Sequence, residues 1–162
     1  MVLSAIVQVN LISAQIESMR LKMDELASTL PEYEVVMNMF GVGHTFGPQL
    51  MAEIGDISRF NHRSALTAFA GVDPGVNQSG KMKIDSNRAS KRGAPRLRKT
   101  LFQIMQTLMQ NAPADNRVYL FMMKKKAEGK PYHVYMTAGA NKFLRIYYGT
   151  VKAHLASQSQ TE

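Results

Sequence analysis

The sequence predicts a mainly α-helical fold, in which a long N-terminal heptad helix precedes a compact helical domain with a helix-hairpin-helix-like turn and a basic loop. Apolar residues recur at helical spacing through most of the 162 residues. Gly and Pro interrupt these runs where helices are expected to end. A polar stretch without apolar periodicity covers residues 72–94. We find no convincing β-hairpin and no internal repeat.

The first expected element is a helix over residues 2–30, closed by Pro31. Its apolar residues follow a strict 3-4 spacing, which defines a heptad seam. The seam residues are Val9, Ile12, Ile16, Met19, Met23, Leu26 and Leu30. Such a seam must be buried against a second copy, another domain or the core of this domain. We favour self-association and expect a homo-oligomer through residues 2–30.

Two further helices are expected on either side of a glycine turn. Residues 33–40 are apolar, and Gly41-Val42-Gly43 separates them from a helix over about 45–54 that ends at Gly55. This arrangement resembles a helix-hairpin-helix, in which backbone N–H groups approach a phosphate closely. Gly41 and Gly43 are therefore candidate nucleic-acid contacts. A plain turn between two helices explains the same pattern.

The rest of the chain predicts four more helical segments and a short tail. The helical segments are residues 63–71, 95–110, 116–127 and 132–155. Gly139 and Gly149 are expected to bend or interrupt the last of them. The predicted organisation is a heptad helix over 1–31, a domain over 32–155 and a disordered tail over 156–162.

Composition excludes several kinds of site. The chain has no cysteine, so disulfides, thiol catalysis and cysteine-ligated zinc are all excluded. The four histidines are scattered, and no acidic constellation suits a two-metal nuclease, so we expect no metal site in this chain. We see no signal peptide and no segment approaching the roughly 20 apolar residues of a membrane span. A bacterial cytoplasmic, nucleoid-associated protein without a membrane partner is expected.

The positive charge is concentrated in one segment. The formal net charge is +8, and residues 81–99 carry eight Lys or Arg and one Asp, which gives +7. Residues 1–80 carry four basic and eight acidic residues, which gives −4. Concentrated positive charge is typical of a polyanion partner, usually nucleic acid. The alternative is a solvated basic loop.

The start of the helix after this loop favours a phosphate ligand. Arg96, Arg98 and Lys99 lie in its first turn, where cations oppose the helix dipole. A bound phosphate would resolve this conflict, because free N–H groups and the dipole both attract an anion. The candidate nucleic-acid-binding side chains are Lys81, Lys83, Arg88, Lys91, Arg92, Arg96, Arg98 and Lys99.

Ser79 is the candidate nucleophile within the polar stretch. It precedes Gly80 and Lys81, so its hydroxyl is expected to be accessible beside a cation. A serine hydroxyl can attack a phosphodiester and conserve the bond energy in a phosphoserine link, if it is activated. From these residues alone, a Ser-Gly pair in a loop is more commonly just a turn.

An ordered set of motifs between residues 41 and 98 resembles one family. The matching segments are Gly41-Val42-Gly43, Leu50 to Asp56, Arg59-Phe60, Ala68 to Pro74, Gln78 to Lys81, Ser90 to Gly93 and Leu97-Arg98. Together they resemble the C-terminal domain of the Piv-type DEDD transposases, the insertion-sequence one-ten family of bridge-RNA-guided recombinases. The similarity covers about residues 33–150.

The resemblance implies a function in DNA transposition and site-specific recombination. In that family, a RuvC-like N-terminal domain carries four acids that bind magnesium, and a partly coiled-coil region follows it. The C-terminal domain supplies a serine nucleophile in the segment that matches Gln78-Ser79-Gly80. Ser79 is thus the implied catalytic residue, and DNA and a guide noncoding RNA are the implied partners. Because no RuvC-like half precedes it here, we expect this chain to be inactive alone.

Two departures and one alternative accompany this interpretation. Phe46-Gly47-Pro48 stands where the family has small, helix-favouring residues, and Asp85 interrupts a segment that the family keeps basic. The alternative function is a non-enzymatic DNA- or RNA-binding helix-hairpin-helix module.

Overall fold

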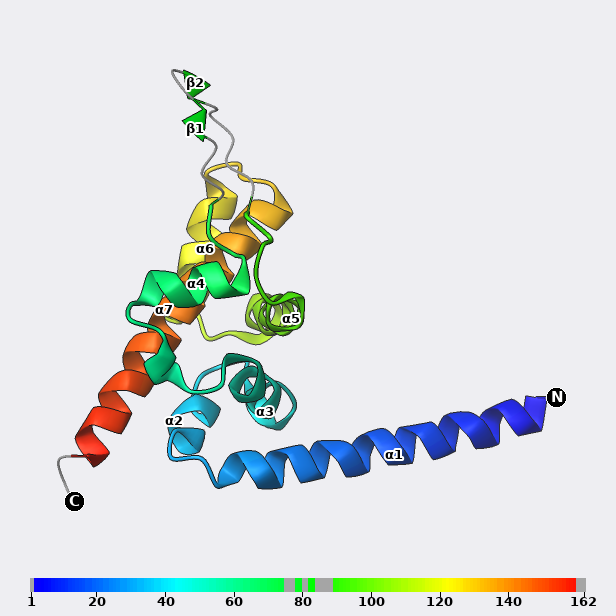
Figure 1. Cartoon of the computed structure of the whole chain (residues 1–162). Coiled ribbons are helices and arrows are strands. Elements are labelled where there is room, and N and C mark those ends of the chain that lie inside the picture. The colour runs from blue at the N-terminus through cyan, green and yellow to red at the C-terminus, as the bar shows by residue number, and fades with distance from the viewer. Residues whose placement is uncertain (1, 75–77, 80–81, 84–88, 160–162) are drawn as a thin grey trace.

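The protein is mainly α-helical, as predicted. The computed structural model describes residues 2–74, 78–79, 82–83 and 89–159. Seven α-helices are present among these residues: α1 (Val2–Ser28), α2 (Tyr33–Met37), α3 (Gly43–Ile54), α4 (Arg63–Ala70), α5 (Pro95–Asn111), α6 (Arg117–Ala127) and α7 (Tyr132–Gln158). A 3-10 turn, η1 (Ile57–Arg59), and two short strands, β1 (Gln78–Ser79) and β2 (Met82–Lys83), complete the described fold (Figure 1).

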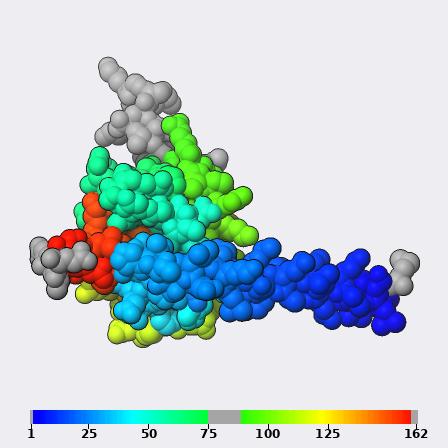
Figure 2. Space-filling view, turned by 60° about the horizontal axis from the view of Figure 1, so that its bottom comes forward, coloured from blue at the N-terminus to red at the C-terminus, as the bar shows by residue number. Residues whose placement is uncertain are grey.

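Helix α1 projects from the helical body as one long, uninterrupted helix (Figures 1 and 2). Ala27 is its one buried residue. The heptad residues are exposed, including Val9 at 61% and Leu26 at 72%. The body of this chain therefore does not cover the heptad seam. Self-association through residues 2–30 stays a prediction.

Length and composition would allow α1 to cross a membrane, contrary to the sequence-based expectation that no segment comes close. An 18-residue window within Val2–Ser28 reaches a mean hydropathy of 1.3, and the helix lies near the N-terminus. These properties are weak evidence for a span. A membrane span needs apolar length but no heptad spacing, whereas a coiled coil needs the spacing that α1 has.

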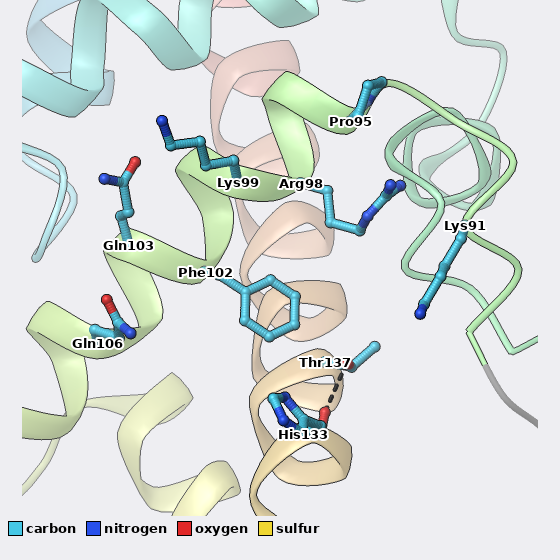
Figure 3. A pocket seen from close by; sticks show the side chains of 9 residues that line it. All are labelled: Lys91, Pro95, Arg98, Lys99, Phe102, Gln103, Gln106, His133 and Thr137. Atoms are coloured by element: carbon cyan, nitrogen blue, oxygen red, sulfur yellow. Dashed lines mark hydrogen bonds between the residues drawn. The ribbon is translucent and has the colours of Figure 1, made fainter.

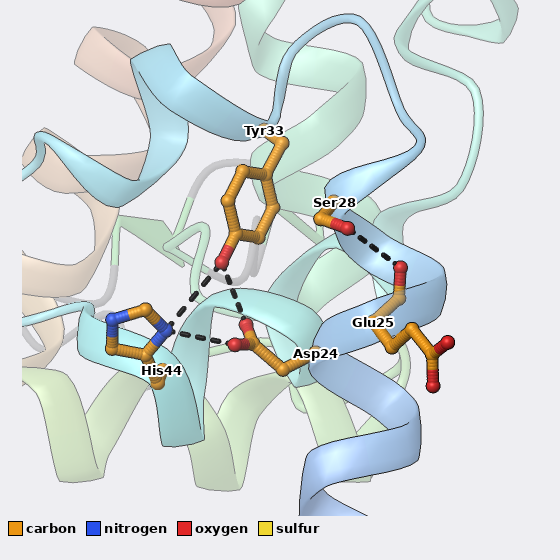
Figure 4. Close-up of polar contacts among 5 residues, drawn as sticks. All are labelled: Asp24, Glu25, Ser28, Tyr33 and His44. Atoms are coloured by element: carbon orange, nitrogen blue, oxygen red, sulfur yellow. Dashed lines mark hydrogen bonds and ion pairs between the residues drawn. The ribbon is translucent and has the colours of Figure 1, made fainter.

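A polar network anchors the base of α1 to the next two helices (Figure 4). The Tyr33 hydroxyl donates to Asp24 Oδ1 at 2.8 Å, and His44 Nδ1 lies 2.9 Å from Asp24 Oδ2. Partial burial raises the pKa of Asp24, but the hydrogen bonds from Tyr33 and His44 outweigh it and hold the pKa below the usual value. The network ties the base of α1 to α2 and α3.

The core forms where α7 packs against α2, α4, α5 and α6. On α5 the buried residues Leu97, Leu101, Ile104, Met105 and Leu108 recur at spacings of three and four, so they form one face of the helix. Burial of each such side chain stabilises the fold by roughly 1.5–3 kcal/mol. Helix α7 is continuous from Tyr132 to Gln158, so the expected interruption at Gly139 or Gly149 is wrong. A Cβ at Gly139 would lie 2.4 Å from Met122 Sδ, so this glycine permits close packing of α6 on α7.

The two glycines of the predicted hairpin turn have different surroundings. Gly41 has a φ of +86°, and a Cβ there would lie 3.4 Å from the Ile104 carbonyl oxygen, so this part of the turn packs against α5. Gly43 begins α3 with a φ of +54° and faces open space. Helix α2 is shorter than the predicted 33–40 and ends at Met37.

Candidate nucleic-acid interface

A short ladder joins the two ends of the polar stretch. Gly71 caps the C-terminal end of α4, and its left-handed conformation turns the chain outward. The Ser90 N–H donates to the Asp73 carbonyl at 3.0 Å, and the Lys91 N–H donates to the Gly71 carbonyl at 3.2 Å. An antiparallel bridge pairs Pro74 with Ala89. We call residues 71–74 and 89–93 the hairpin stem.

Hydrogen bonds and close backbone packing hold this stem together and against α4. The Ser90 hydroxyl donates to Asp73 Oδ1 at 2.5 Å across the ladder. The Ala94 N–H donates to the Phe69 carbonyl at 2.7 Å. A Cβ at Gly93 would lie 1.8 Å from that same carbonyl oxygen, so only glycine fits there. Residues 71–74 and 89–93, which are separated in the sequence, are therefore joined to each other and packed against α4.

Beyond the stem, β1 and β2 form an antiparallel pair at the far end of the molecule (Figure 1). The backbone of Ser79 pairs with Met82, and that of Gln78 pairs with Lys83. The expectation of no β-hairpin is therefore wrong. Strands of two residues are too short to show the apolar alternation by which a strand is recognised.

The predicted site residues differ in how much of each the structure describes. Lys81 and Arg88 lie outside the described residues, and for Ser79 and Lys83 the structure describes the backbone. The other five predicted cations gather where the stem meets the start of α5: Lys91, Arg92, Arg96, Arg98 and Lys99. All but Arg98 are exposed. In the part of the chain that the structure describes, none of the five forms an ion pair with an acid.

Arg98 and Lys91 have structural constraints as well as charge. Arg98 is half-buried, and its Nη1 donates to the Ala70 carbonyl at 3.2 Å, which satisfies an acceptor at the C-terminal end of α4. Lys91 has a φ of +53°, a left-handed conformation that costs a non-glycine residue roughly 1–2 kcal/mol. Its hydrogen bond to Gly71 holds it in this conformation. Strained backbone of this kind is common at functional sites.

A groove of about 540 Å³ lies between α5 and α7 beside these cations (Figure 3). Its lining residues are Lys91, Pro95, Arg98, Lys99, Phe102, Gln103, Gln106, His133 and Thr137. Figure 3 shows Phe102 extending from α5 toward His133 and Thr137 on α7. The Thr137 hydroxyl donates to the His133 carbonyl at 2.7 Å. We call this space the α5–α7 groove.

A second groove, of about 900 Å³, adjoins the first on the other side of Lys91, His133 and Thr137. Pro74 and Ala89 of the stem contribute to it, so the hairpin rises directly from its edge. Helices α4, α6 and α7 supply the other walls, which include Phe121 and Arg145. Lys142 and Lys125 lie 5.6 and 5.9 Å from the centre of the Phe121 ring. The basic surface thus continues from α5 to α6 and α7.

Sequence reasoning missed the groove residues on α7. His133 and Thr137 reach the groove only through the fold, and no sequence pattern around them indicates a binding site. Phe102, Gln103 and Gln106 had a signal, because they follow Lys99 at spacings of three, four and seven and so share one helix face. Among the described residues, no three His, Asp or Glu side chains come together as a metal site.

Comparison with known families gives one match. A family model described as Transposase IS116/IS110/IS902 family matches residues 33–120. This span is 88 of the 162 residues, and it contains α2 to α5, the hairpin stem and the start of α6. No curated protein matches the chain.

Proposed function

The chain belongs to the IS116/IS110/IS902 transposase family, and from this premise we propose that the surface around its hairpin stem binds DNA and presents Ser79 as a nucleophile. The match supports a role in transposition for the chain as a whole. The DNA contacts, the nucleophile and a guide noncoding RNA as partner are parts of the proposal.

The observation that carries the proposal is the cluster of unpaired cations at the base of the hairpin. Lys91, Arg92, Arg96 and Lys99 are exposed and lack acid partners among the described residues. Their mutual repulsion is unfavourable in the free protein, and a phosphate backbone would relieve it. The N-terminus of α5 adds backbone N–H donors, because Ala94 at its N-cap offers no side-chain cap.

The hairpin then places Ser79 beyond this phosphate-binding base. In the proposed step, Ser79 Oγ loses its proton and forms a bond to phosphorus. The bond from phosphorus to a deoxyribose oxygen breaks, and that oxygen takes up a proton. The phosphoserine ester conserves the bond energy until a second DNA hydroxyl attacks it and restores the serine. In the family that the chain resembles, magnesium is held by acids of a separate RuvC-like domain.

The experiment looks for a covalent protein–DNA adduct on a denaturing gel. It uses the transposase with the DNA ends of its own element and any noncoding RNA transcribed beside it. We expect an adduct with the wild type and none with Ser79→Ala, while both bind the DNA equally. An adduct that persists in Ser79→Ala would place the nucleophile elsewhere. Recombination without any adduct would leave this chain as a non-enzymatic binding module.

A further inference from the structure

Helix α5 has a second, polar and partly exposed face beside its buried one. Lys99, Phe102, Gln103 and Gln106 share this face and line the α5–α7 groove. No acid lies on it. It presents a cation, an aromatic ring and two amides. These are the groups that hold a phosphate, stack on a base and hydrogen-bond to base edges.

The Phe102 ring on this face is only partly buried against the core. Phe102 is half-buried and packs on the core with one side, while the rest of the ring borders the groove. A ring placed in this way can still bury apolar area against a flat partner. Stacking of a base on an aromatic side chain contributes about 1–3 kcal/mol per base and needs no particular sequence.

The opposite wall of the groove adds polar groups without negative charge. His133 and Thr137 lie one turn apart on α7, and the Thr137 hydroxyl is engaged by the His133 carbonyl. The His133 ring contacts Tyr132 edge-on, with centroids 5.2 Å apart, and remains exposed. The groove is therefore apolar at Phe102, polar on both walls and cationic at the end nearest the stem.

The dimensions favour an unpaired nucleotide over a double helix. About 540 Å³ falls within the roughly 300–1,000 Å³ typical of pockets for small ligands. A base can reach a ring set between two helices only after it leaves the stack of its own duplex. Lys91 belongs both to the stem and to the groove, so a strand that passes the hairpin would also pass the groove.

We infer that the α5–α7 groove binds an unpaired nucleotide of the DNA strand that passes the hairpin. Its base lies against Phe102, and its edge is within reach of Gln103 and Gln106. Lys91 and Lys99 hold its phosphates. This inference rests on the proposed function, because it takes the DNA strand at the hairpin as the ligand and specifies which part of it is bound unpaired.

The test measures binding of the 162-residue chain to an oligonucleotide of about 12 nucleotides with a central 2-aminopurine. Single-stranded DNA, the matching duplex and single-stranded RNA are compared by fluorescence anisotropy. For the wild type, we expect 2-aminopurine quenching in the DNA single strand. Phe102→Ala should abolish the quenching and weaken single-strand binding roughly 5- to 100-fold, with duplex binding changed less than about twofold.

Phe40→Ala is the matched control, because it removes the same side chain from a position that is 38% exposed and lines neither groove. It should leave the quenching intact. Gln106→Glu is a second variant at an exposed position, where folding is insensitive, and its negative charge should weaken single-strand binding. Thermal melting checks that Phe102→Ala remains folded.

Several outcomes would overturn the inference. Equal losses for single strand and duplex, or no loss in Phe102→Ala and Gln106→Glu, would remove the base-binding role from the groove. Tighter RNA binding with the same Phe102 dependence would show that the occupant is not DNA. Phe102-dependent binding of single-stranded DNA, together with no Ser79 adduct, would retain the groove and reject the proposed nucleophile.

Discussion

At the scale of single residues, glycine determines how the hairpin stem is held. Gly71 and Gly93 lie back to back, since a Cβ at Gly71 would come within 2.9 Å of the Gly93 nitrogen. A side chain at Gly93 would have to displace the Phe69 carbonyl, which accepts the hydrogen bond from the Ala94 N–H. The family motif around these glycines is thus explained by packing before any ligand is considered.

We predict opposite effects for two Gly→Ala substitutions. Gly93→Ala forces a Cβ against the Phe69 carbonyl oxygen at 1.8 Å, so it should lower the free energy of unfolding by about 1–3 kcal/mol. Gly149 is an exposed position of α7, and a Cβ there would have no atom within 4 Å. Gly149→Ala should therefore raise the free energy of unfolding by about 0.5–1 kcal/mol. Urea denaturation of both variants measures these changes. A neutral Gly93→Ala would mean that the stem is not packed as described.

Arg98 shows why charge alone does not define a binding residue. It was predicted as a phosphate contact from its place in the first turn of α5, but its guanidinium also binds the Ala70 carbonyl. A net contribution of about 0.5–1.5 kcal/mol to stability is usual for such a hydrogen bond. Arg96, which is exposed, has no such second role in the structure. Loss of binding in an Arg98 variant would therefore need a stability measurement before it is interpreted.

At the scale of elements, the network at the base of α1 makes the anchoring of this helix sensitive to acid. The pKa of Asp24 is lower in the folded protein than its ordinary 3.8, because hydrogen bonds from Tyr33 and His44 outweigh the effect of burial. A carboxyl with a lowered pKa stabilises the folded state above its unfolded pKa. This contribution is lost as the pH falls through the folded pKa.

We therefore predict that Asp24→Asn destabilises the protein at pH 6 and has progressively less effect as the pH falls below about 4. Thermal melting of wild type and variant across this range measures the difference. Tyr33→Phe removes the donor to Asp24 Oδ1 and should reproduce part of the same pH dependence. A difference between Asp24→Asn and wild type that stays constant with pH would exclude the carboxylate as the stabilising group.

Elements were predicted well where the sequence repeats a single period. Helices α5, α6 and α7 begin within a residue of their predicted starts, because their apolar faces run for three turns or more. The stem could not be predicted in this way. Asp73 and Ser90 are 17 residues apart, and their hydrogen bond depends on the fold that brings α4 beside α5. The cations of the site were predicted because they are close together in the sequence. Its α7 wall was not predicted, because the fold brings His133 and Thr137 to the groove from a distant part of the chain.

At the scale of the whole molecule, charge and apolar surface are segregated. The hairpin stem and the start of α5 carry a cluster of unpaired cations, while α1 carries most of the exposed large apolar side chains. An apolar helix in water needs a partner, and its heptad seam favours a second copy of the chain. Oligomerisation through α1 would place two or more basic surfaces on one assembly. The proposed DNA binding could then engage two or more DNA segments at once.

Two substitutions can distinguish association through the heptad seam from association through the overall apolar surface of α1. Ile16 lies on the seam and is 46% exposed, whereas Leu21 lies on the opposite side of the helix and is 64% exposed. We predict that Ile16→Gln shifts the protein toward monomer in sedimentation equilibrium, because it places an amide at a position that packs against the partner helix. Leu21→Gln should leave the association constant unchanged. If both substitutions weaken association equally, or if both instead reduce binding to lipid vesicles, total apolar surface and not the heptad register determines what α1 binds.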